Sequence, residues 1–321
     1  MLAAYAESMN FDDPLSGLVI GEIEEPACPE GWTTLAMKAA SLNHHDLWSL
    51  RGIGLPPERL PMILGCDAAG IDQNGNEMIA YSIVSDAPIG MDETIDEGRS
   101  ILSERYPGTF AERVHLPANN LIPKPTGWTW AQAACLPTAW LTAYRMLAVR
   151  SGLRPGNTVL VQGAGGGVAT ACIALGAAMG LRVWVTSRSE DKRQRALEIG
   201  AHDVFGSNAR LPERVDAVME TVGDATWEHS IKVLKSGGTI VISGATSGPN
   251  PPASLTRIFF KQLSIVGSTM GTLEDLRNLV ALCDIADIRP IVQAEFELPD
   301  AREAFSVLAS GDVFGKLVLT N

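Results

Sequence analysis

The feature that most constrains the fold of this chain is a glycine-rich turn near its middle. The apolar run TVLVQ at 158–162 leads directly into the spacing Gly163-x-x-Gly166-x-x-Ala169, which opens a segment rich in Ala and Gly. Glycine allows the backbone to turn tightly and to approach a ligand closely, and the free N–H groups at a helix N-terminus attract an anion. The pattern predicts a strand, a turn and a helix that hold a pyrophosphate, rather than a turn that only packs helix against sheet.

Strand-like and helix-like segments alternate around this turn. A doubly wound, six-stranded parallel sheet of the α/β class is the natural solution for strands joined by helical crossovers. An amphipathic helix is expected from about 130 to 149, so the nucleotide-binding domain is predicted to span 126–271. The expected strands lie at 158–162, 182–187, 203–205, 215–222, 239–243 and 263–268.

The remaining segments predict a second, β-rich domain. The first 125 residues contain short strand-like runs interrupted by Pro and Gly. The tail from 272 begins with a helix-like segment and ends with the strand-like runs IVQAEFELP and GKLVLT. We expect this tail to return, so that 1–125 and 272–321 together form one domain.

Composition excludes several classes of partner. The chain has 25 Lys+Arg against 37 Asp+Glu, a formal net charge of −12, which repels nucleic acid and anionic lipid. The uncharged stretch 158–181 is long enough to cross a bilayer, but its glycines make it a poor span. The five cysteines are scattered without a C-x-x-C pair, and no basic apolar leader precedes the first domain. We therefore expect a cytoplasmic protein with reduced thiols and with no membrane or nucleic-acid partner.

The second expected strand indicates which dinucleotide is bound. An NAD site usually has an Asp or Glu about 20 residues beyond the glycine turn, where it binds the ribose 2′-hydroxyl. Here Thr186, Ser187 and Arg188 follow, and the acids Glu190 and Asp191 come only later. Hydroxyl groups and a guanidinium suit a 2′-phosphate, so we predict NADPH. Lys192 could add a second charge; the alternative is that Arg188 and Lys192 only begin a solvated helix.

Several motifs together resemble the medium-chain dehydrogenase/reductase superfamily, in particular its zinc-free quinone oxidoreductase or zeta-crystallin-like branch. The resemblance covers nearly the whole chain and implies a Rossmann sheet plus a GroES-like catalytic domain, in a homodimer that pairs through an edge strand near GTIVIS or LSIVGS. The motifs are LNHHDLW (42–48), LPMILGCDAAG (60–70), GTFAERVHLPANNLIPKP (108–125), CLPTAWLTAYRML (135–147), VLVQGAGGGVA (159–169), GGTIVISGATSG (237–248), IVGSTMGT (265–272) and FGKLVLT (314–320).

The resemblance also implies site residues. Asn43, Asp46 and Trp48 would lie near the nicotinamide and are the candidate catalytic residues. In the plain interpretation of the same segment, Asn43 and Asp46 cap a helix, Trp48 is buried, and the two histidines between them form a local turn. The residues implied to line the dinucleotide are Thr142, Gly163, Gly166, Gly167, Val168, Ser187, Arg188, Lys192, Val222, Gly244, Ala245, Ser268 and Met270.

The zinc site of the related alcohol dehydrogenases is not matched. Where those enzymes have a Cys, a His, a neighbouring Glu and a last ligand, this chain offers Asn43, Cys66, Asp67 and about Thr138. Only Cys66 and Asp67 among these could bind zinc, whereas a catalytic zinc usually has three protein ligands. The cysteine lobe of the structural zinc is also missing from the acidic segment 81–108, which could instead cover a cleft or an oligomer surface. We expect no metal, although His44 or His45 could complete a set.

These expectations favour one chemistry. Without zinc and without a Tyr-x-x-x-Lys pair, the sequence offers no obvious group to take the proton from an alcohol. Hydride transfer to a quinone or an α,β-unsaturated carbonyl needs only a hydrogen bond to the acceptor's oxygen, from the Asn43 amide or a ribose hydroxyl. The alternatives are a zinc-dependent alcohol dehydrogenase and an NADPH-binding redox sensor or crystallin-like protein with little turnover. Cys66 and Cys135 are either reactive or simply buried, and Lys316 and Arg51 either reach the ligands or lie at the surface.

Overall fold

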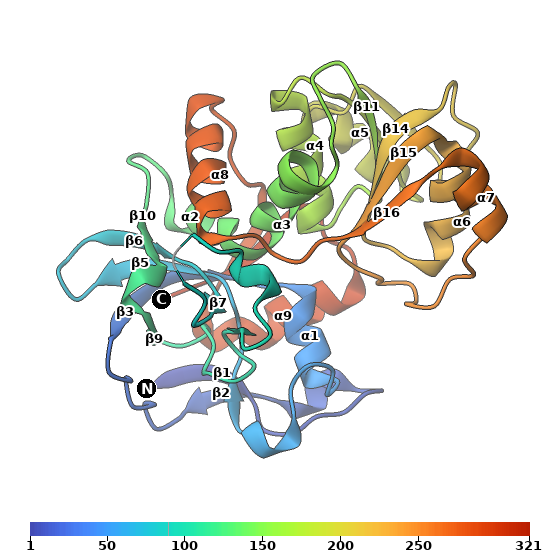
Figure 1. The fold of residues 1–321 in the computed structure, drawn as a ribbon. Helices are drawn as coiled ribbons and strands as arrows, with labels where there is room; N and C mark the ends of the chain where they lie inside the picture. Colours follow the sequence, from blue (N-terminus) through green and yellow to red (C-terminus); the bar gives the residue numbers. More distant parts are fainter. Residues whose placement is uncertain (89) are drawn as a thin grey trace. The chain divides into compact units, whose positions relative to one another are not determined.

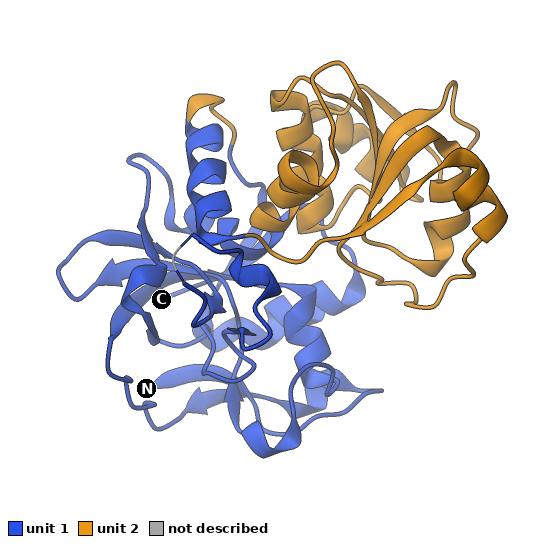
Figure 2. Ribbon diagram, viewed as in Figure 1, with its two compact units in different colours: residues 1–139, 272–284, 289–321 blue, residues 140–271, 285–288 orange. Residues whose placement is uncertain are grey.

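The structure is a computed structural model that describes residues 1–88 and 90–321. The chain forms two compact units (Figure 2). Unit 1 comprises 1–139, 272–284 and 289–321, and unit 2 comprises 140–271 and 285–288. The sequence placed the change of domain at 125/126, whereas the first unit continues to residue 139.

Unit 2 is built on a six-stranded sheet in which every pair is parallel. The strand order β13-β12-β11-β14-β15-β16 reverses direction at β11, as in doubly wound sheets, and it confirms the predicted fold class. Because β15 is paired on both sides, only β16 of the two strands expected at a dimer interface lies at the sheet edge. The strands are β11 (Thr158–Gln162), β12 (Arg182–Thr186), β13 (Asp203–Phe205), β14 (Val215–Glu220), β15 (Leu234–Ile242) and β16 (Ser264–Gly267).

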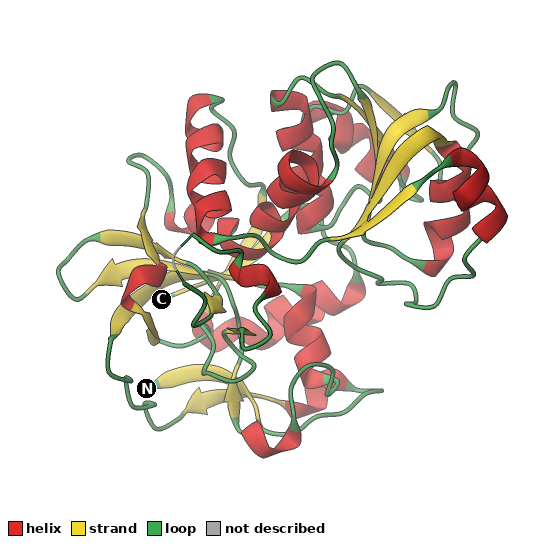
Figure 3. Ribbon diagram, viewed as in Figure 1, coloured by secondary structure: helices red, strands yellow, loops and turns green. Residues whose placement is uncertain are grey.

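Helices lie on both sides of this sheet, α4 and α5 on one side and α6 and α7 on the other (Figures 1 and 3). A sheet covered on both faces needs continuously apolar strands rather than alternating ones, and all five residues of β11 are buried. The expected uncharged span 158–181 is therefore β11, the glycine turn and α4. No helix in the described part of the chain is long and apolar enough to cross a membrane. The helices are α4 (Gly167–Ala178), α5 (Glu190–Glu198), α6 (Asp224–Val233) and α7 (Leu255–Lys261).

The helix predicted over about 130–149 is present but irregular. It is divided into α2 (Trp130–Ala134), a π-helical turn η5 (Leu136–Trp140), α3 (Leu141–Tyr144) and a second π turn η6 (Arg145–Arg150). Proline lacks the N–H that a regular helix uses, which explains the irregularity around Pro137.

Unit 1 contains the β-rich domain and the returning tail. Its main sheet has the order β10-β6-β5-β3-β18-β17, with β9 paired to β3, and a second sheet has the order β2-β1-β4. The C-terminal strand β18 runs antiparallel to β3 with Val318 opposite Ser41, so the tail does complete the first domain. The strands are β1 (Leu2–Ala6), β2 (Leu18–Glu22), β3 (Trp32–Ser41), β4 (Met62–Ile63), β5 (Ala68–Asp72), β6 (Glu77–Ala80), β7 (Ile83–Val84), β8 (Ser100–Ile101), β9 (Arg113–Pro117), β10 (Leu121–Pro123), β17 (Val292–Glu297) and β18 (Lys316–Thr320).

The helices of unit 1 pack around a core of aliphatic side chains and Phe110 and Phe305, whose rings meet edge to face. The short helix α1 begins directly after β3, so the end of a central strand and a helix start come together there. The helices are α1 (His44–Leu50), α8 (Leu273–Ile285), α9 (Ala301–Ser310) and the short 3₁₀ turns η1 (Pro14–Gly17), η2 (Pro57–Arg59), η3 (Glu93–Ile95), η4 (Ala118–Asn120) and η7 (Leu298–Asp300).

The acidic segment 81–108 is anchored to unit 1 at several points, and residue 89 lies outside the described residues. Its strands β7 and β8 pair with each other. Glu93 accepts hydrogen bonds from the Tyr81 hydroxyl at 3.0 Å and from the backbone of Leu273 at 2.6 Å. Glu104, near its end, contacts His45 on α1.

Candidate active site

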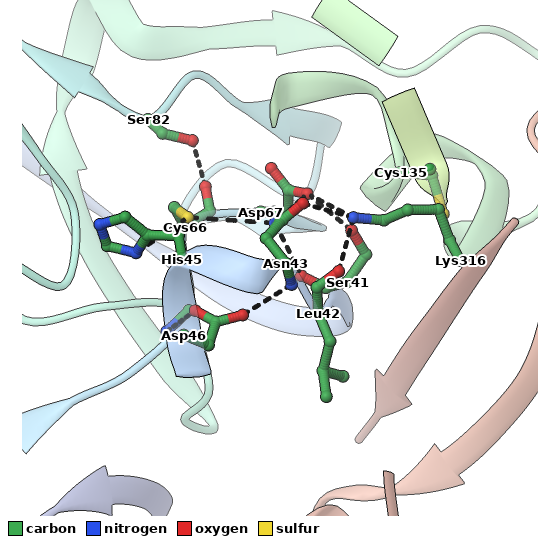
Figure 4. A network of polar contacts seen from close by, with 12 residues as sticks. Ser41, Leu42, Asn43, His45, Asp46, Cys66, Asp67, Ser82, Cys135 and Lys316 are labelled. Atoms are coloured by element: carbon green, nitrogen blue, oxygen red, sulfur yellow. Dashed lines mark hydrogen bonds and ion pairs between the residues drawn. The ribbon is translucent and has the colours of Figure 1, made fainter. Parts of the chain in front are cut away.

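Asn43 joins β3 to α1, and its side chain belongs to a buried polar cluster with Ser41, Asp67 and Lys316 (Figure 4). The amide nitrogen Nδ2 donates to Asp67 Oδ2 at 2.8 Å and to the Ser41 carbonyl at 3.3 Å. The amide oxygen accepts from the Lys316 ammonium at 2.6 Å. In this arrangement every hydrogen-bonding group of the Asn43 amide has a protein partner, so binding a substrate oxygen would require one of these bonds to break.

Lys316 is buried at the start of β18, which contradicts the alternative that placed it at the surface. Its side chain is 3 % exposed, and the ammonium also donates to the Leu42 carbonyl at 2.6 Å and lies 3.5 Å from Asp67 Oδ2. Asp67 is fully buried and also accepts from the Ser41 hydroxyl at 2.6 Å. The sequence signal for this role is a single lysine inside the apolar run FGKLVLT, which does not by itself distinguish a buried lysine from a surface one.

Cys66 lies beside His45, and His45 in turn contacts Glu104. The Cys66 sulfur is 4.0 Å from His45 Nδ1, and His45 Nε2 is 3.2 Å from Glu104 Oε1. Burial raises the pKa of the Cys66 thiol, and the neighbouring His45 opposes this effect. Burial lowers the pKa of His45, but Cys66, Glu104 and Asp46 outweigh it and hold that pKa well above its usual value.

The other candidate residues of this segment have local roles. Asp46 is fully buried; Oδ2 accepts from the Asn43 backbone at 2.7 Å and Oδ1 from the Gly65 backbone at 3.2 Å, so it caps α1. Burial raises the pKa of Asp46 to about 6. Trp48 is half-buried and its ring centre lies 6.5 Å from that of the exposed His44.

The side chains do not fit the zinc site of the metal-dependent alcohol dehydrogenases. Asn43, at the position of the first Cys ligand, and Asp67, at that of the neighbouring Glu, already bind the Lys316 ammonium, which would repel a nearby metal ion. Among the described residues, one other group, His45, Asp46 and Cys66, has ligand atoms within 4.8 Å of one another. Each Asp46 oxygen already accepts a backbone N–H group, so an ion bound there would compete with the bonds that cap α1.

The remaining thiols fit the expectation of reduced, inert cysteines. Cys135, Cys172 and Cys283 are free cysteines with buried side chains, whereas Cys28 is free and exposed. Burial raises the pKa of Cys135 and Cys283 to about 12, and raises that of Cys172 further. A thiol in such surroundings reacts slowly because the thiolate is the nucleophile.

In unit 2, the glycine turn has the geometry that an anion site requires. Gly163 has φ +85°, a conformation that L side chains rarely adopt. A Cβ added at Gly166 would meet no atom within 4 Å, so the turn is open to a ligand. Gly166 precedes α4, whose first N–H groups have no side-chain cap. The turn therefore fits the pyrophosphate of a dinucleotide.

The parallel register brings most of the implied cofactor residues to one edge of the sheet. Gln162 is opposite Thr186, Glu220 is opposite Ile242, and Ile242 is opposite Gly267, so all of these strands end at the same level. The residues that follow the strand ends are those implied by the resemblance: Gly163, Gly166, Gly167 and Val168, then Ser187 and Arg188, Val222, Gly244 and Ala245, and Ser268. Met270 follows with φ +46°, rare for a side chain of this size, and Thr142 is buried in α3.

Glu220, at the end of β14, is a residue that the sequence analysis missed. Its buried carboxylate accepts from the backbone N–H groups of Val222 at 2.9 Å and Gly223 at 3.1 Å, and from the hydroxyls of Thr226 at 2.8 Å and Ser230 at 2.6 Å. These bonds fix the turn that carries Val222. An acid ending an apolar strand was the available signal.

At the end of β12, one of the two hydroxyl groups expected to face a 2′-phosphate is turned away from that position. The Thr186 hydroxyl points inward and donates to Gln162 at 2.5 Å, so it faces away from any 2′-phosphate. Ser187 lies at the strand end and Arg188 is exposed, while the Ser189 side chain caps α5 at the backbone of Lys192. Arg193, not singled out from the sequence, holds the Ser187 carbonyl at 2.7 Å.

Comparison with known proteins agrees with the architecture. Residues 167–284 match the family model described as zinc-binding dehydrogenase. The zinc-type alcohol dehydrogenase-like protein C1773.06c of Schizosaccharomyces pombe is 30% identical over 337 residues, covering 96% of this chain and 97% of its own. An acryloyl-coenzyme A reductase of Metallosphaera sedula is 28% identical over 322 residues, covering 95% and 96%.

A solved structure described as an NAD-dependent alcohol dehydrogenase superposes with a TM-score of 0.91 at 31% identity, covering 100% of both chains. The full-length match at this identity, together with the Rossmann sheet, the glycine turn and the returning C-terminal strand, leaves one assignment. The chain belongs to the medium-chain dehydrogenase/reductase superfamily, as an alcohol dehydrogenase-like oxidoreductase.

Proposed function

We propose that this protein is an NADPH-dependent reductase that adds a hydride to an α,β-unsaturated carbonyl compound without a catalytic metal. The observation that carries the proposal is the polar cluster of Ser41, Asn43, Asp67 and Lys316, in which an amide stands at the position of the first Cys ligand and binds an ammonium. An alcohol substrate needs a metal or a base to release its proton, whereas a conjugated acceptor spreads the incoming charge onto its oxygen. The resemblance to an acryloyl-coenzyme A reductase supports the same acceptor class.

The division of labour follows from the two units. Unit 2, most of which lies within the expected 126–271, would form the nucleotide domain, and unit 1, with 1–125 and most of 272–321, the substrate domain. The glycine turn and the start of α4 would hold the pyrophosphate, and Ser187 and Arg188 the 2′-phosphate. When bound, NADPH supplies the hydride. The chain's own side chains orient the acceptor and exclude water around it, with Asn43 and Trp48 as the candidates at the reacting end.

The cofactor assignment depends on the end of β12. No acid stands there to bind a ribose 2′-hydroxyl, and the Arg193 guanidinium pairs with Glu190, which reduces the repulsion that this acid would exert on a phosphate. The similar solved structure is described as NAD-dependent, so the preference of this chain has to be measured directly. A small quinone is the second acceptor to test, because it accepts a hydride for the same electronic reason.

The test follows the loss of NADPH absorbance with chelator-treated protein. A 2-alkenal, an enoyl thioester, a small quinone and a primary alcohol with NADP⁺ are compared, and NADH is the cofactor control. Turnover of the alkenal or thioester that survives chelation and prefers NADPH supports the proposal. Activity only with the alcohol, or only after zinc is restored, would instead favour the alcohol dehydrogenase, and tight NADPH binding without turnover of any acceptor would favour a sensor.

A further inference from the structure

The side chain of Lys316 is buried in unit 1, and its hydrogen-bond partners among residues 1–88 and 90–321 are oxygen atoms. Its ammonium contacts the Leu42 carbonyl at 2.6 Å, the Asn43 amide oxygen at 2.6 Å and Asp67 Oδ2 at 3.5 Å. The exposed fraction is 3 % for the Lys316 side chain and 0 % for that of Asp67. A carbonyl, an amide oxygen and a carboxylate are ligands typical of a hard cation, so the ammonium is bound much as an ion would be.

Two of these three ligands lie in the segments that match the zinc site by the resemblance, Asn43 at the position of the first Cys ligand and Asp67 at that of the neighbouring Glu. The ammonium determines how both are arranged. Because the amide oxygen of Asn43 faces the ammonium, the amide nitrogen Nδ2 of Asn43 faces Asp67. The Asp67 oxygen Oδ2 accepts hydrogen bonds from Ser41, Asn43 and Lys316. The other oxygen, Asp67 Oδ1, is buried without a hydrogen-bond partner.

The charges in this cluster balance only while the ammonium is present. One buried carboxylate faces one buried ammonium, so their sum is zero. Adding a divalent ion would leave two units of uncompensated positive charge among buried side chains, and such charge is costly to bury. Removing the ammonium would instead leave one uncompensated negative charge, the buried Asp67 carboxylate beside an amide oxygen and the Cys66 thiol.

We propose that Lys316 is the built-in cation of this cluster, which neutralises Asp67, orients Asn43 and thereby keeps a divalent metal ion out. The inference rests on the metal-free form of the proposed function, but it concerns metal binding and its test does not measure turnover. It makes Lys316 a positioning residue for Asn43. It also predicts that the cluster gains metal affinity when the positive charge alone is removed.

The test is a titration with Co²⁺, whose thiolate charge-transfer band in the near ultraviolet reports ligation by Cys66. The full-length chain is compared with Lys316→Ala, with Lys316→Arg, which keeps a cation, and with the double variant Lys316→Ala/Asp67→Asn, which leaves the same space but no carboxylate. We expect no band in the unsubstituted chain or in Lys316→Arg. Lys316→Ala should bind Co²⁺ more tightly by roughly tenfold or more, the size of effect that one outer contact has on metal affinity, and the double variant should lose this gain.

Two results would overturn the inference. Stoichiometric Co²⁺ binding by the unsubstituted chain with a band that Cys66→Ser abolishes would show that Lys316 does not exclude the metal. Folded Lys316→Ala that binds no more Co²⁺ than the unsubstituted chain would show that the ammonium is not the reason for exclusion. If circular dichroism shows that Lys316→Ala does not fold, Lys316→Gln, which keeps hydrogen-bond donors without charge, replaces it with the same expectations.

Discussion

Removing the charge of Lys316 should destabilise unit 1, and the reason lies in what remains of the cluster. In Lys316→Met the methionine side chain still fills the space of the lysine. Among the described residues, Asp67 then keeps the hydrogen bonds from Ser41 and Asn43 to Oδ2, while Oδ1 has no hydrogen-bond partner. Breaking a buried ion pair from one side typically costs about 3–5 kcal/mol. Because two hydrogen bonds to the carboxylate survive, we expect a loss near the lower end, about 3 kcal/mol.

A double-mutant cycle isolates the interaction between the two charges. Asp67→Asn should cost about 1–2 kcal/mol, less than the lysine change, because the ammonium keeps the Leu42 and Asn43 oxygens. The double variant Lys316→Met/Asp67→Asn buries no charge at this point. It should therefore lose about 2 kcal/mol less than the sum of the single changes.

The measurement is urea unfolding of the four proteins, with the slope m checked for each so that only shifts in midpoint are compared. Lys38→Met serves as the matched control, since Lys38 is a half-buried lysine on β3 for which no ion pair is found among the described residues. It should change the unfolding free energy by less than about 0.5 kcal/mol. A coupling energy below about 0.5 kcal/mol between positions 67 and 316 would refute the reasoning, because the two groups would then act independently.

The other predictions concern the cofactor, the thiols and the sheet edge. Arg188→Ala should raise the KM for NADPH by roughly tenfold or more, the value of one charge-assisted hydrogen bond, and leave the KM for NADH unchanged in the same assay. Glu220→Ala should instead raise the KM for both cofactors alike, because it loosens the Val222 turn rather than the phosphate contact; a change confined to NADPH would contradict this role. In the native chain a thiol reagent should label Cys28 rapidly and the four buried cysteines only on unfolding, and Cys28→Ser should remove the rapid phase. Phe260 is 76% exposed on α7, the helix that directly precedes the edge strand β16. Phe260→Asp should therefore convert the expected dimer to a monomer in sedimentation velocity, and an unchanged sedimentation coefficient would place the dimer contact elsewhere.

The fold of unit 2 could be predicted because its signals are local. An apolar strand, the glycine spacing at Gly163 and Gly166 and a helix follow one another within a short segment, and parallel strands with helical crossovers leave few topologies. The exception was Thr186, whose hydroxyl was expected at the phosphate. Which face of a strand end a side chain takes depends on the partner across the sheet, here Gln162, and that pairing is not visible in the local sequence.

The site in unit 1 could be predicted only in part, for the opposite reason. Asn43, Asp46 and Cys66 were singled out from their own segments, and the capping role of Asp46 follows from its spacing to Asn43. Lys316 was left undecided because it meets Asn43 only through the antiparallel pairing of β18 with β3, across most of the chain. Charge at a buried site is decided by such distant partners.

This dependence also limits what residue types at matching positions can say about metal chemistry. Asn43, Cys66 and Asp67 could each contribute a donor atom to an ion, and counting them alone leaves the metal question open. Their partners add to this count, because the Asn43 oxygen is bound to Lys316 and the Asp67 carboxylate faces the same ammonium at 3.5 Å. A chain with these three residues and an apolar side chain at 316 would have an unpaired buried carboxylate and would be expected to recruit a cation. The residue at 316 is thus, besides the ligand positions themselves, a position at which the charge of this cluster decides its affinity for a cation.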